Sequence, residues 1–223
     1  MDTRERIVEA ATALLTEGGR EAVSTRAVSA AAGVQAPTIY RIFGDKQGLL
    51  DAVAAHGFRA YLEQKAGQTP SDDPVADLRA GWDVHIGFGL ANPALYSLIY
   101  GEPRPGRSTP AATAAAEMLA KLIRRVAEAG RLRVTEERAA HVVHAAGVGT
   151  TLTLIAEPPD SRDLTASTLT REAVLAAITT DTPVAAPGVA SAAVALRAAL
   201  PETRALTVHE RALLTEWLDR IAD

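Results

Sequence analysis

The stretch STRAVSAAAGVQAPTIYRIFGDK, residues 24–46, decides the fold. Its first part predicts a short helix with Ser24 or Thr25 as the N-cap, and its second part predicts another short helix from about Ala36. Gly33 lies between them and can end the first helix, because glycine adopts a positive φ without steric cost. Two short amphipathic helices joined by a three- to four-residue turn that contains glycine are typical of the DNA-reading helix-turn-helix.

Helices are also expected on both sides of this motif. Residues 3–17 carry apolar side chains at offsets of 0, 3, 4, 7 and 8, which is the spacing of one helical face, and Gly18-Gly19 is expected to end that helix. Asp45 is expected to cap a fourth helix over residues 46–66. The length of this helix suits a connector between the motif and the rest of the chain.

The rest of the chain is expected to form a helical regulatory and dimerisation domain over residues 70–223, after a helix-turn-helix domain over residues 1–46. Residues 67–74 are polar and rich in proline, which is typical of a linker. Abundant alanine and few aromatic residues favour helix over sheet, so the expected fold class is all-α. Helices are predicted at about 75–91, 93–100, 110–129, 136–156, 170–179, 189–200 and 207–222.

Residues 4–62 resemble the tetracycline-repressor (TetR) family of transcriptional regulators. The resemblance rests on Gly33-Val34, on Thr38-x-Tyr40-x-x-Phe43, and on Lys46 followed by Leu49-Leu50. It implies a dimeric regulator, by default a repressor, with an N-terminal three-helix helix-turn-helix domain and a C-terminal helical ligand-binding domain. Gly48 departs from the pattern, because the family usually has a good helix former there. Because Gly48 lies near the helix start, we expect it to lower the stability of the helix by less than about 1 kcal/mol.

Eight side chains of the motif are expected to contact operator DNA: Thr25, Arg26, Gln35, Pro37, Thr38, Tyr40, Arg41 and Lys46. If Ile39 faces inward, Tyr40 and Arg41 point outward toward a major groove. The hydroxyls and the Lys46 ammonium suit phosphate oxygens, which position the protein. Recognition of bases is then left to Arg26, Gln35 and Arg41. Arginine can make bidentate contacts with guanine, and glutamine can make them with adenine.

The family resemblance also implies a cavity for a small-molecule effector among the middle helices. The candidates for its wall combine apolar surface with few polar groups. They are Trp82, His85, Phe88, Tyr96, Tyr100, Met118, Leu122 and His144. Ordinary core packing is the alternative for each of them. No resident cofactor is expected.

The segment 136–156 is rich in alanine and glycine on more than one side, so we expect a helix that is buried all round. Small residues permit close helix packing, and in the resembled family the late helices form a dimeric four-helix bundle. We therefore assign this helix, together with the helix near residues 170–179, to a homodimer interface; the alternative is a core helix within one subunit. His141 and His144 lie three residues apart, but no third ligand at suitable spacing supports a metal site.

Composition limits the remaining function classes. The chain has no cysteine, a net charge of -4 and no apolar leader segment, so we expect a cytoplasmic protein without a membrane span. Between Arg20 and Lys46 four basic residues face two acidic ones, a locally basic balance inside the acidic total. Two other readings stay open. One is a helical enzyme that pairs His85, His141 or His144 with Asp83 or Glu117, and the other is a helical adaptor that binds protein.

Overall fold

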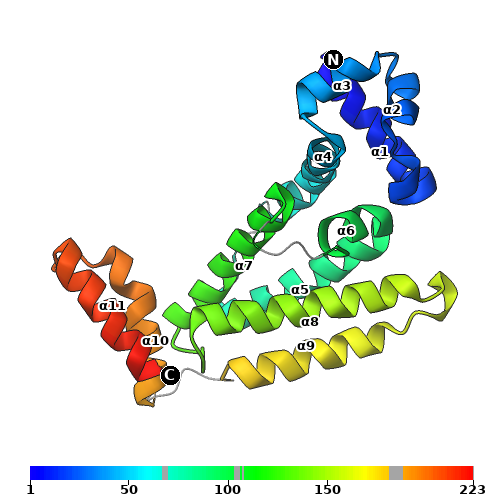
Figure 1. Cartoon of the computed structure of the whole chain (residues 1–223). Coiled ribbons are helices and arrows are strands. Elements are labelled where there is room, and N and C mark those ends of the chain that lie inside the picture. Colours follow the sequence, from blue (N-terminus) through cyan, green and yellow to red (C-terminus); the bar gives the residue numbers. More distant parts are fainter. Residues whose placement is uncertain (67–69, 103–105, 107, 181–187, 223) are drawn as a thin grey trace. The chain divides into compact units, whose positions relative to one another are not determined.

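The computed structural model describes the chain except residues 67–69, 103–105, 107, 181–187 and 223 (Figure 1). The described residues form eleven α-helices and no strand, so the all-α prediction is confirmed. The α-helices are α1 (Thr3–Ala22), α2 (Thr25–Ala32), α3 (Ala36–Phe43), α4 (Lys46–Ala66), α5 (Pro74–Ala91), α6 (Pro93–Tyr100), α7 (Pro110–Glu128), α8 (Glu136–Ala156), α9 (Leu164–Ile178), α10 (Val189–Ala199) and α11 (Val208–Ala222). Two short 3-10 helices add η1 (Pro159–Ser161) and η2 (Leu200–Glu202).

The chain divides into two compact units. Unit 1 comprises residues 1–69, 87–115 and 151–157, and unit 2 comprises residues 70–86, 116–150 and 158–223. The functional division into residues 1–46, 46–66 and 70–223 stays a prediction.

The N-terminal part of unit 1 packs α1, α2, α3 and α4 around a common apolar core. α1 begins with a capping box in which Asp2 and Glu5 satisfy each other's backbone N–H groups. At Gly19 the φ angle is 66°, so the helix is interrupted where the sequence predicts an end, and one further turn follows. The core is formed by Ile7, Val8, Ala11, Leu15, Val23, Val28, Ile39, Leu49, Leu50 and Val53.

A second part of unit 1 is an aromatic cluster contributed by α4, α5 and α6. The Phe58 and Tyr61 rings on α4 lie 5.3 and 4.6 Å from the Phe88 ring on α5, and Tyr96 and Tyr100 on α6 have ring centroids 4.8 Å apart. Such tilted and edge-on pairs add to the apolar area that the rings bury. The α6 region also reaches α1 in the same unit, where Arg20 Nη1 lies 2.5 Å from Glu102 Oε2.

In unit 2, polar contacts join α5 to α9. The indole N–H of Trp82 donates to Ser167 Oγ at 3.0 Å, and both side chains are buried. Arg79 pairs with Glu172, and Arg171 pairs with Asp83. These pairs hold α9 along α5.

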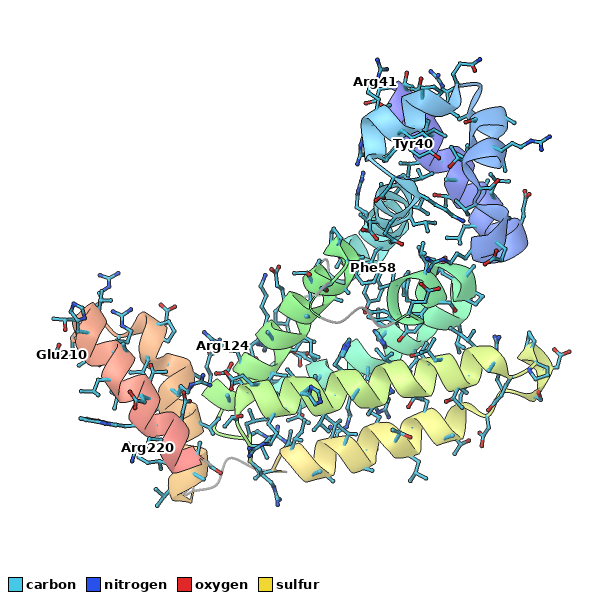
Figure 2. All side chains as sticks on the ribbon, viewed as in Figure 1. Tyr40, Arg41, Phe58, Arg124, Glu210 and Arg220 are labelled. Carbon is cyan, nitrogen blue, oxygen red and sulfur yellow. The ribbon has the colours of Figure 1, made fainter. Side chains whose placement is uncertain are left out.

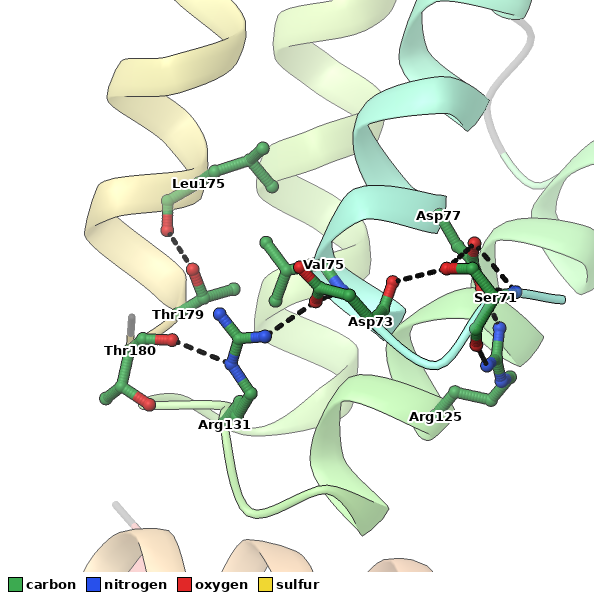
Figure 3. A network of polar contacts seen from close by, with 9 residues as sticks. All are labelled: Ser71, Asp73, Val75, Asp77, Arg125, Arg131, Leu175, Thr179 and Thr180. Atoms are coloured by element: carbon green, nitrogen blue, oxygen red, sulfur yellow. Dashed lines mark hydrogen bonds and ion pairs between the residues drawn. The ribbon is translucent and has the colours of Figure 1, made fainter. Parts of the chain in front are cut away.

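The first turn of α5 is held by a network that Figure 3 shows from close by. Arg131 Nη1 donates to Asp73 Oδ1 at 2.6 Å, while Arg125 pairs with Asp77 and donates to the Ser71 carbonyl oxygen at 2.7 Å. Arg125 lies near the end of α7, and Arg131 lies in the segment between α7 and α8. The network therefore fixes the start of α5 to the α7–α8 connection within unit 2.

One expectation about the late helices is wrong. α9 begins at Leu164 instead of about residue 170, because the Asp163 side chain accepts a hydrogen bond from Thr165 N at 2.8 Å and caps the helix there. Within one chain α8 is buried on one side, so its burial all round stays a prediction that depends on a second copy. Val143 and Gly147 are buried, whereas His144, Ala145 and Gly149 are exposed.

α10 and α11 form a helical hairpin that follows α9. Its core is small and apolar, with Ala193, Val194 and Ala198 on α10 facing Leu218 and Ala222 on α11. The hairpin is tied to the first turn of α8. Arg197 contacts Glu137 Oε1 at 2.8 Å and Asp219 Oδ1 at 2.6 Å.

Candidate nucleic-acid interface

The caps of α2 place the polar start of this helix beside α3. Ser24 is the N-cap, because its Oγ accepts a hydrogen bond from Ala27 N at 3.1 Å. Gly33 ends α2 with φ 63°, in the left-handed region, as the sequence predicts. The chain then turns back into α3, and the Thr25 and Tyr40 hydroxyl oxygens lie 3.5 Å apart. Two expected phosphate-contacting groups are therefore neighbours.

α3 has one buried side and one polar, exposed side. Ile39 is buried in the core, whereas Tyr40 is 51% exposed although it is a large aromatic residue. Figure 2 labels Tyr40 and Arg41 on this helix, and Arg41 is also exposed. Gln35 and Pro37 are exposed at the helix start, and the Gln35 side chain makes no capping hydrogen bond. An exposed ring among hydrogen-bonding groups favours binding of a polar partner at this face.

The remaining members of the expected set lie at the two neighbouring helices. Arg26 is exposed in the first turn of α2, and Lys46 is exposed at the first residue of α4. Thr25 and Thr38 are half-buried. All eight side chains thus reach the surface of the same small bundle, and their contacts with DNA stay a prediction.

Gly48 is a structural requirement that the sequence reasoning underestimated. Asp45 Oδ1 accepts a hydrogen bond from Gly48 N at 2.7 Å, which caps α4 as predicted. A Cβ atom at Gly48 would lie 2.0 Å from the Phe43 carbonyl oxygen. The tight turn from α3 into α4 therefore excludes any side chain at this position, and the turn fixes where Lys46 lies.

Arg4 is a candidate that the sequence reasoning missed. Its guanidinium carbon lies 5.5 Å from the centre of the Phe43 ring, at the end of α3. Such a cation–π contact holds a positive charge beside the segment that leads to Lys46. Arg4 and Phe43 are 39 positions apart in the sequence, and no local sequence pattern predicts that they are in contact.

The expected effector-binding residues fall in both units. Phe88, Tyr96 and Tyr100 belong to the aromatic cluster of unit 1. Burial raises the pKa values of Tyr96 and Tyr61, and it raises the pKa of Tyr100 to about 12, so these phenols stay protonated at neutral pH. The cluster can therefore offer hydroxyl groups inside an aromatic environment.

The other expected effector-binding residues belong to unit 2 and have several different environments. Trp82 is buried with its N–H on Ser167, and Met118 and Leu122 are half-buried on α7. His144 is on the exposed side of α8. Partial burial of its ring, and then the neighbouring His141, lower its pKa. Among the described residues, no group of three or more histidines and carboxylates is arranged to hold a metal ion.

Comparison with known proteins agrees with this geometry. Residues 7–53 match the model of the bacterial regulatory proteins of the tetR family. Over 74 residues the chain is 36% identical to the HTH-type transcriptional repressor KstR of Rhodococcus jostii (strain RHA1), which covers 33% of this chain and 34% of that protein. The chain thus matches about a third of the length of this curated relative.

Solved structures share the fold over most of the chain. A putative tetR family transcription regulator from Shewanella sp. PV-4 has a TM-score of 0.63 at 19% identity and covers 81% of this chain and 100% of its own. A TetR variant from Acinetobacter baumannii AYE, in complex with minocycline, has a TM-score of 0.62 at 22% identity and covers 79% and 96%. The helix-turn-helix match and the shared helical fold lead to one conclusion: residues 7–53 are a DNA-binding segment of the tetR family of bacterial regulatory proteins, within a chain that has the helical fold of its regulators.

Proposed function

We propose that the protein is a homodimeric transcriptional repressor that binds a palindromic operator and is released from it by a small-molecule effector. The observation that carries this proposal is the outer face of α3, where Tyr40 is 51% exposed among polar side chains. Members of this family are transcription regulators and generally not enzymes, and the relative from Rhodococcus is a repressor. Such a regulator acts in the cytoplasm, where we place this protein.

The arrangement supports two roles for the eight side chains. Tyr40, Thr25 and Lys46 surround the start of α2 and the turn between α3 and α4, so they suit phosphate oxygens on either side of a major groove. Arg26 and Gln35 are exposed at the starts of α2 and α3, where their planar groups can reach base edges. Arg4 adds a further positive charge for the backbone, since Phe43 holds it beside the end of α3.

A second copy of the chain is proposed to cover the exposed side of α8 and α9. In the most apolar 18-residue window of α8, only 28% is buried within the chain. By length and composition alone this helix could also cross a membrane, which is weak evidence because helices of soluble bundles meet the same criterion. The exposed residues are small, with Ala145 and Gly149 on α8 and Ala173 on α9, and small residues let two helices approach closely.

The effector is proposed to bind among the aromatic residues of α4, α5 and α6. These rings provide apolar surface, and their hydroxyl groups place a few polar atoms within it. A ligand shifts DNA binding only if its affinity differs between the DNA-bound and the free arrangement. The effector should therefore bind the free dimer more tightly than the operator complex.

The test is a titration of the full-length protein with labelled DNA from upstream of its own coding sequence, followed by fluorescence anisotropy. We expect tight binding that survives an excess of unrelated DNA, and footprinting should show two symmetric half-sites about one helical turn apart or somewhat more. Equal affinity for both DNAs, or one asymmetric site, would contradict the proposal.

The enzyme and adaptor readings gain no support from the described residues. Asp83, the carboxylate that an enzyme would use, is paired with Arg171 at 2.5 Å between Oδ1 and Nη1. An adaptor would present apolar surface at the helix-turn-helix, but the outer face of α3 is polar apart from the Tyr40 and Pro37 rings.

A further inference from the structure

The exposed large apolar side chains of unit 2 gather in two separate groups. One group is Leu164 and Leu169 in the first half of α9, where Leu169 is 72% exposed. The other group belongs to the α10–α11 hairpin, with Val189 and Leu196 on α10 and with Val208, Leu213, Trp217 and Ile221 on α11. Large apolar side chains that are exposed next to one another mark an interaction site on a soluble protein.

The hairpin group has the periodicity of a helix face. Leu213, Trp217 and Ile221 follow one another at intervals of four residues on α11, beside the buried Leu218 and Ala222. They are therefore not used to join α11 to α10. Trp217 is 49% exposed, and tryptophan is among the residues that contribute most to protein interfaces.

The two groups lie at opposite ends of the α8–α9 layer. The Arg197–Glu137 pair ties the hairpin to the first turn of α8. The end of α9 lies at that same end, because Thr179 forms a β-bridge with Leu132, just before α8. Leu164 is at the other end of α9, about 21 Å away at a rise of 1.5 Å per residue.

We propose that the hairpin is an arm that packs on the start of α9 of a second copy of this chain. This proposal rests on the homodimer of the proposed function. In a two-fold contact across the α8–α9 face, with the axis perpendicular to the helices, each end of one subunit meets the opposite end of its partner. Each hairpin then covers the partner's α9 start, and both apolar groups are buried by one symmetric arrangement.

Both apolar groups have charged neighbours. Glu216 and Arg220 flank Trp217 on α11, and Arg220 is labelled in Figure 2. Arg162 and Asp163 precede Leu164 at the start of α9. A positive and a negative group thus lie beside each apolar group, and charges at the rim of a contact affect its specificity more than its strength.

The hairpin is also consistent with an addition to the shared fold. The Shewanella structure is matched over its whole length, yet it leaves 19% of this chain, about 42 of its 223 residues, without a counterpart. The segment from Gly188 to the end of the hairpin at Ala222 has a comparable length.

Cross-linking between subunits tests the arm. The chain has no cysteine, so Ala166→Cys beside Leu169 and Ala212→Cys beside Leu213 introduce unique thiols at exposed alanines. Subunits with one or the other change are mixed, exchanged and treated with a short bismaleimide. We expect a cross-linked heterodimer, and no such product when Ala120→Cys on α7 replaces Ala212→Cys.

Truncation of the anchor gives an independent readout. Trp217→Ala should weaken the dimer about 30-fold in analytical ultracentrifugation, with the helical content unchanged because Trp217 is at the surface. A dimer that shows neither the cross-link nor this weakening overturns the arm and leaves the proposed function intact. Cross-linking of Ala212→Cys subunits only to one another also overturns the arm. A monomeric protein overturns both proposals.

Discussion

α3 and α8 both leave one helical face uncovered, but the two faces differ in chemistry. At α3 the uncovered face carries the Tyr40 phenol and the Arg41 guanidinium, with the Gln35 amide at the N-cap, and only Ile39 is deeply buried. On α8 it carries alanine, glycine and histidine over a helix of 21 residues. Hydrogen-bonding groups favour a nucleic acid, whereas small apolar groups favour another helix. The composition of an exposed helix face thus indicates its class of partner.

The largest expected effect comes from a charge placed on the α8 face. Ala145→Glu should weaken the dimer at least about 100-fold, or roughly 2.8 kcal/mol, because a two-fold interface would bury two unpaired carboxylates. Sedimentation velocity over a dilution series measures the change. The matched control is Ala120→Glu, which adds the same charge at an exposed alanine of α7. If both variants dimerise as well as the unaltered protein, α8 is not the interface.

Local signals in the sequence were sufficient for the DNA-binding part of the chain. Ser24, Gly33 and Asp45 act on their own helix ends, so they mark both ends of α2 and the start of α4 correctly. The start of α9 was missed because the threonine-rich segment after Asp163 has low helix propensity. Its helix is stabilised instead by the cap and by contacts such as Trp82 with Ser167.

Contacts between distant parts of the chain were not accessible from the sequence. The periodicity of α8 shows that it packs on something, but not that Gly147 faces α5 while Ala145 faces outward. In the same way, the position of Arg4 over Phe43 depends on the packing of α1 against α3. Sequence patterns give the faces of a helix, and tertiary structure decides what each face meets.

A pair of identical substitutions compares the packing of the two regions. Gly48→Ala should destabilise the protein by about 1–3 kcal/mol, since its Cβ would overlap the Phe43 carbonyl oxygen. Gly147→Ala should be neutral or stabilise by up to about 1 kcal/mol, since the nearest atom, His85 Cδ2, would be 3.6 Å away. Urea denaturation measures both. Equal effects of the two changes would show that the α3–α4 turn has room for a side chain.

A smaller effect, about tenfold on DNA affinity, is expected when a phosphate contact is removed from the α3 region. Lys46→Ala should weaken binding to specific and to unrelated DNA by similar factors. Because a dimer has two copies of Lys46, the slope of log affinity against log salt should flatten by about 1.8. Tyr40→Phe should also weaken binding to both DNAs without changing the base preference. Lys121→Ala on α7 removes the same charge elsewhere and should leave the slope unchanged. A changed base preference in Lys46→Ala would contradict the assigned orientation of α3 and α4.

The same region offers a contrast in base reading. Arg26→Ala or Gln35→Ala should relax preference at defined operator positions by roughly 1–3 kcal/mol for each bidentate pair of hydrogen bonds that the substitution removes. Arg41 is exposed on the same face and can belong to either class. Competition with single-base operator variants distinguishes the classes. A uniform decrease in affinity for all sequences would place the substituted residue among those that bind phosphate.

The smallest effect concerns polar residues that serve stability and not DNA binding, at the start of α5. Burial tends to raise the pKa of Asp73, but hydrogen bonds from the Val75 and Ala76 N–H groups and the Arg131 guanidinium outweigh it and lower the pKa. For Asp77, burial again raises the pKa, while Ser71 and Arg125 lower it further. Both carboxyls are therefore more acidic in the folded chain than in the unfolded chain.

A lowered folded-state pKa gives stability that is complete well above the unfolded value of 3.8 and is lost as the pH falls through the folded value. Thermal unfolding between pH 7 and pH 3 should thus show a decline below about pH 4, as expected for carboxyls with this ordinary pKa. Asp73→Asn combined with Asp77→Asn should make that decline shallower, whereas Asp72→Asn, at the exposed neighbouring position, should not. Operator affinity at neutral pH should stay the same in all three proteins. If the double variant loses DNA binding at neutral pH while it remains folded, the polar network of unit 2 takes part in recognition, and the distinction between the faces of α3 and of unit 2 fails.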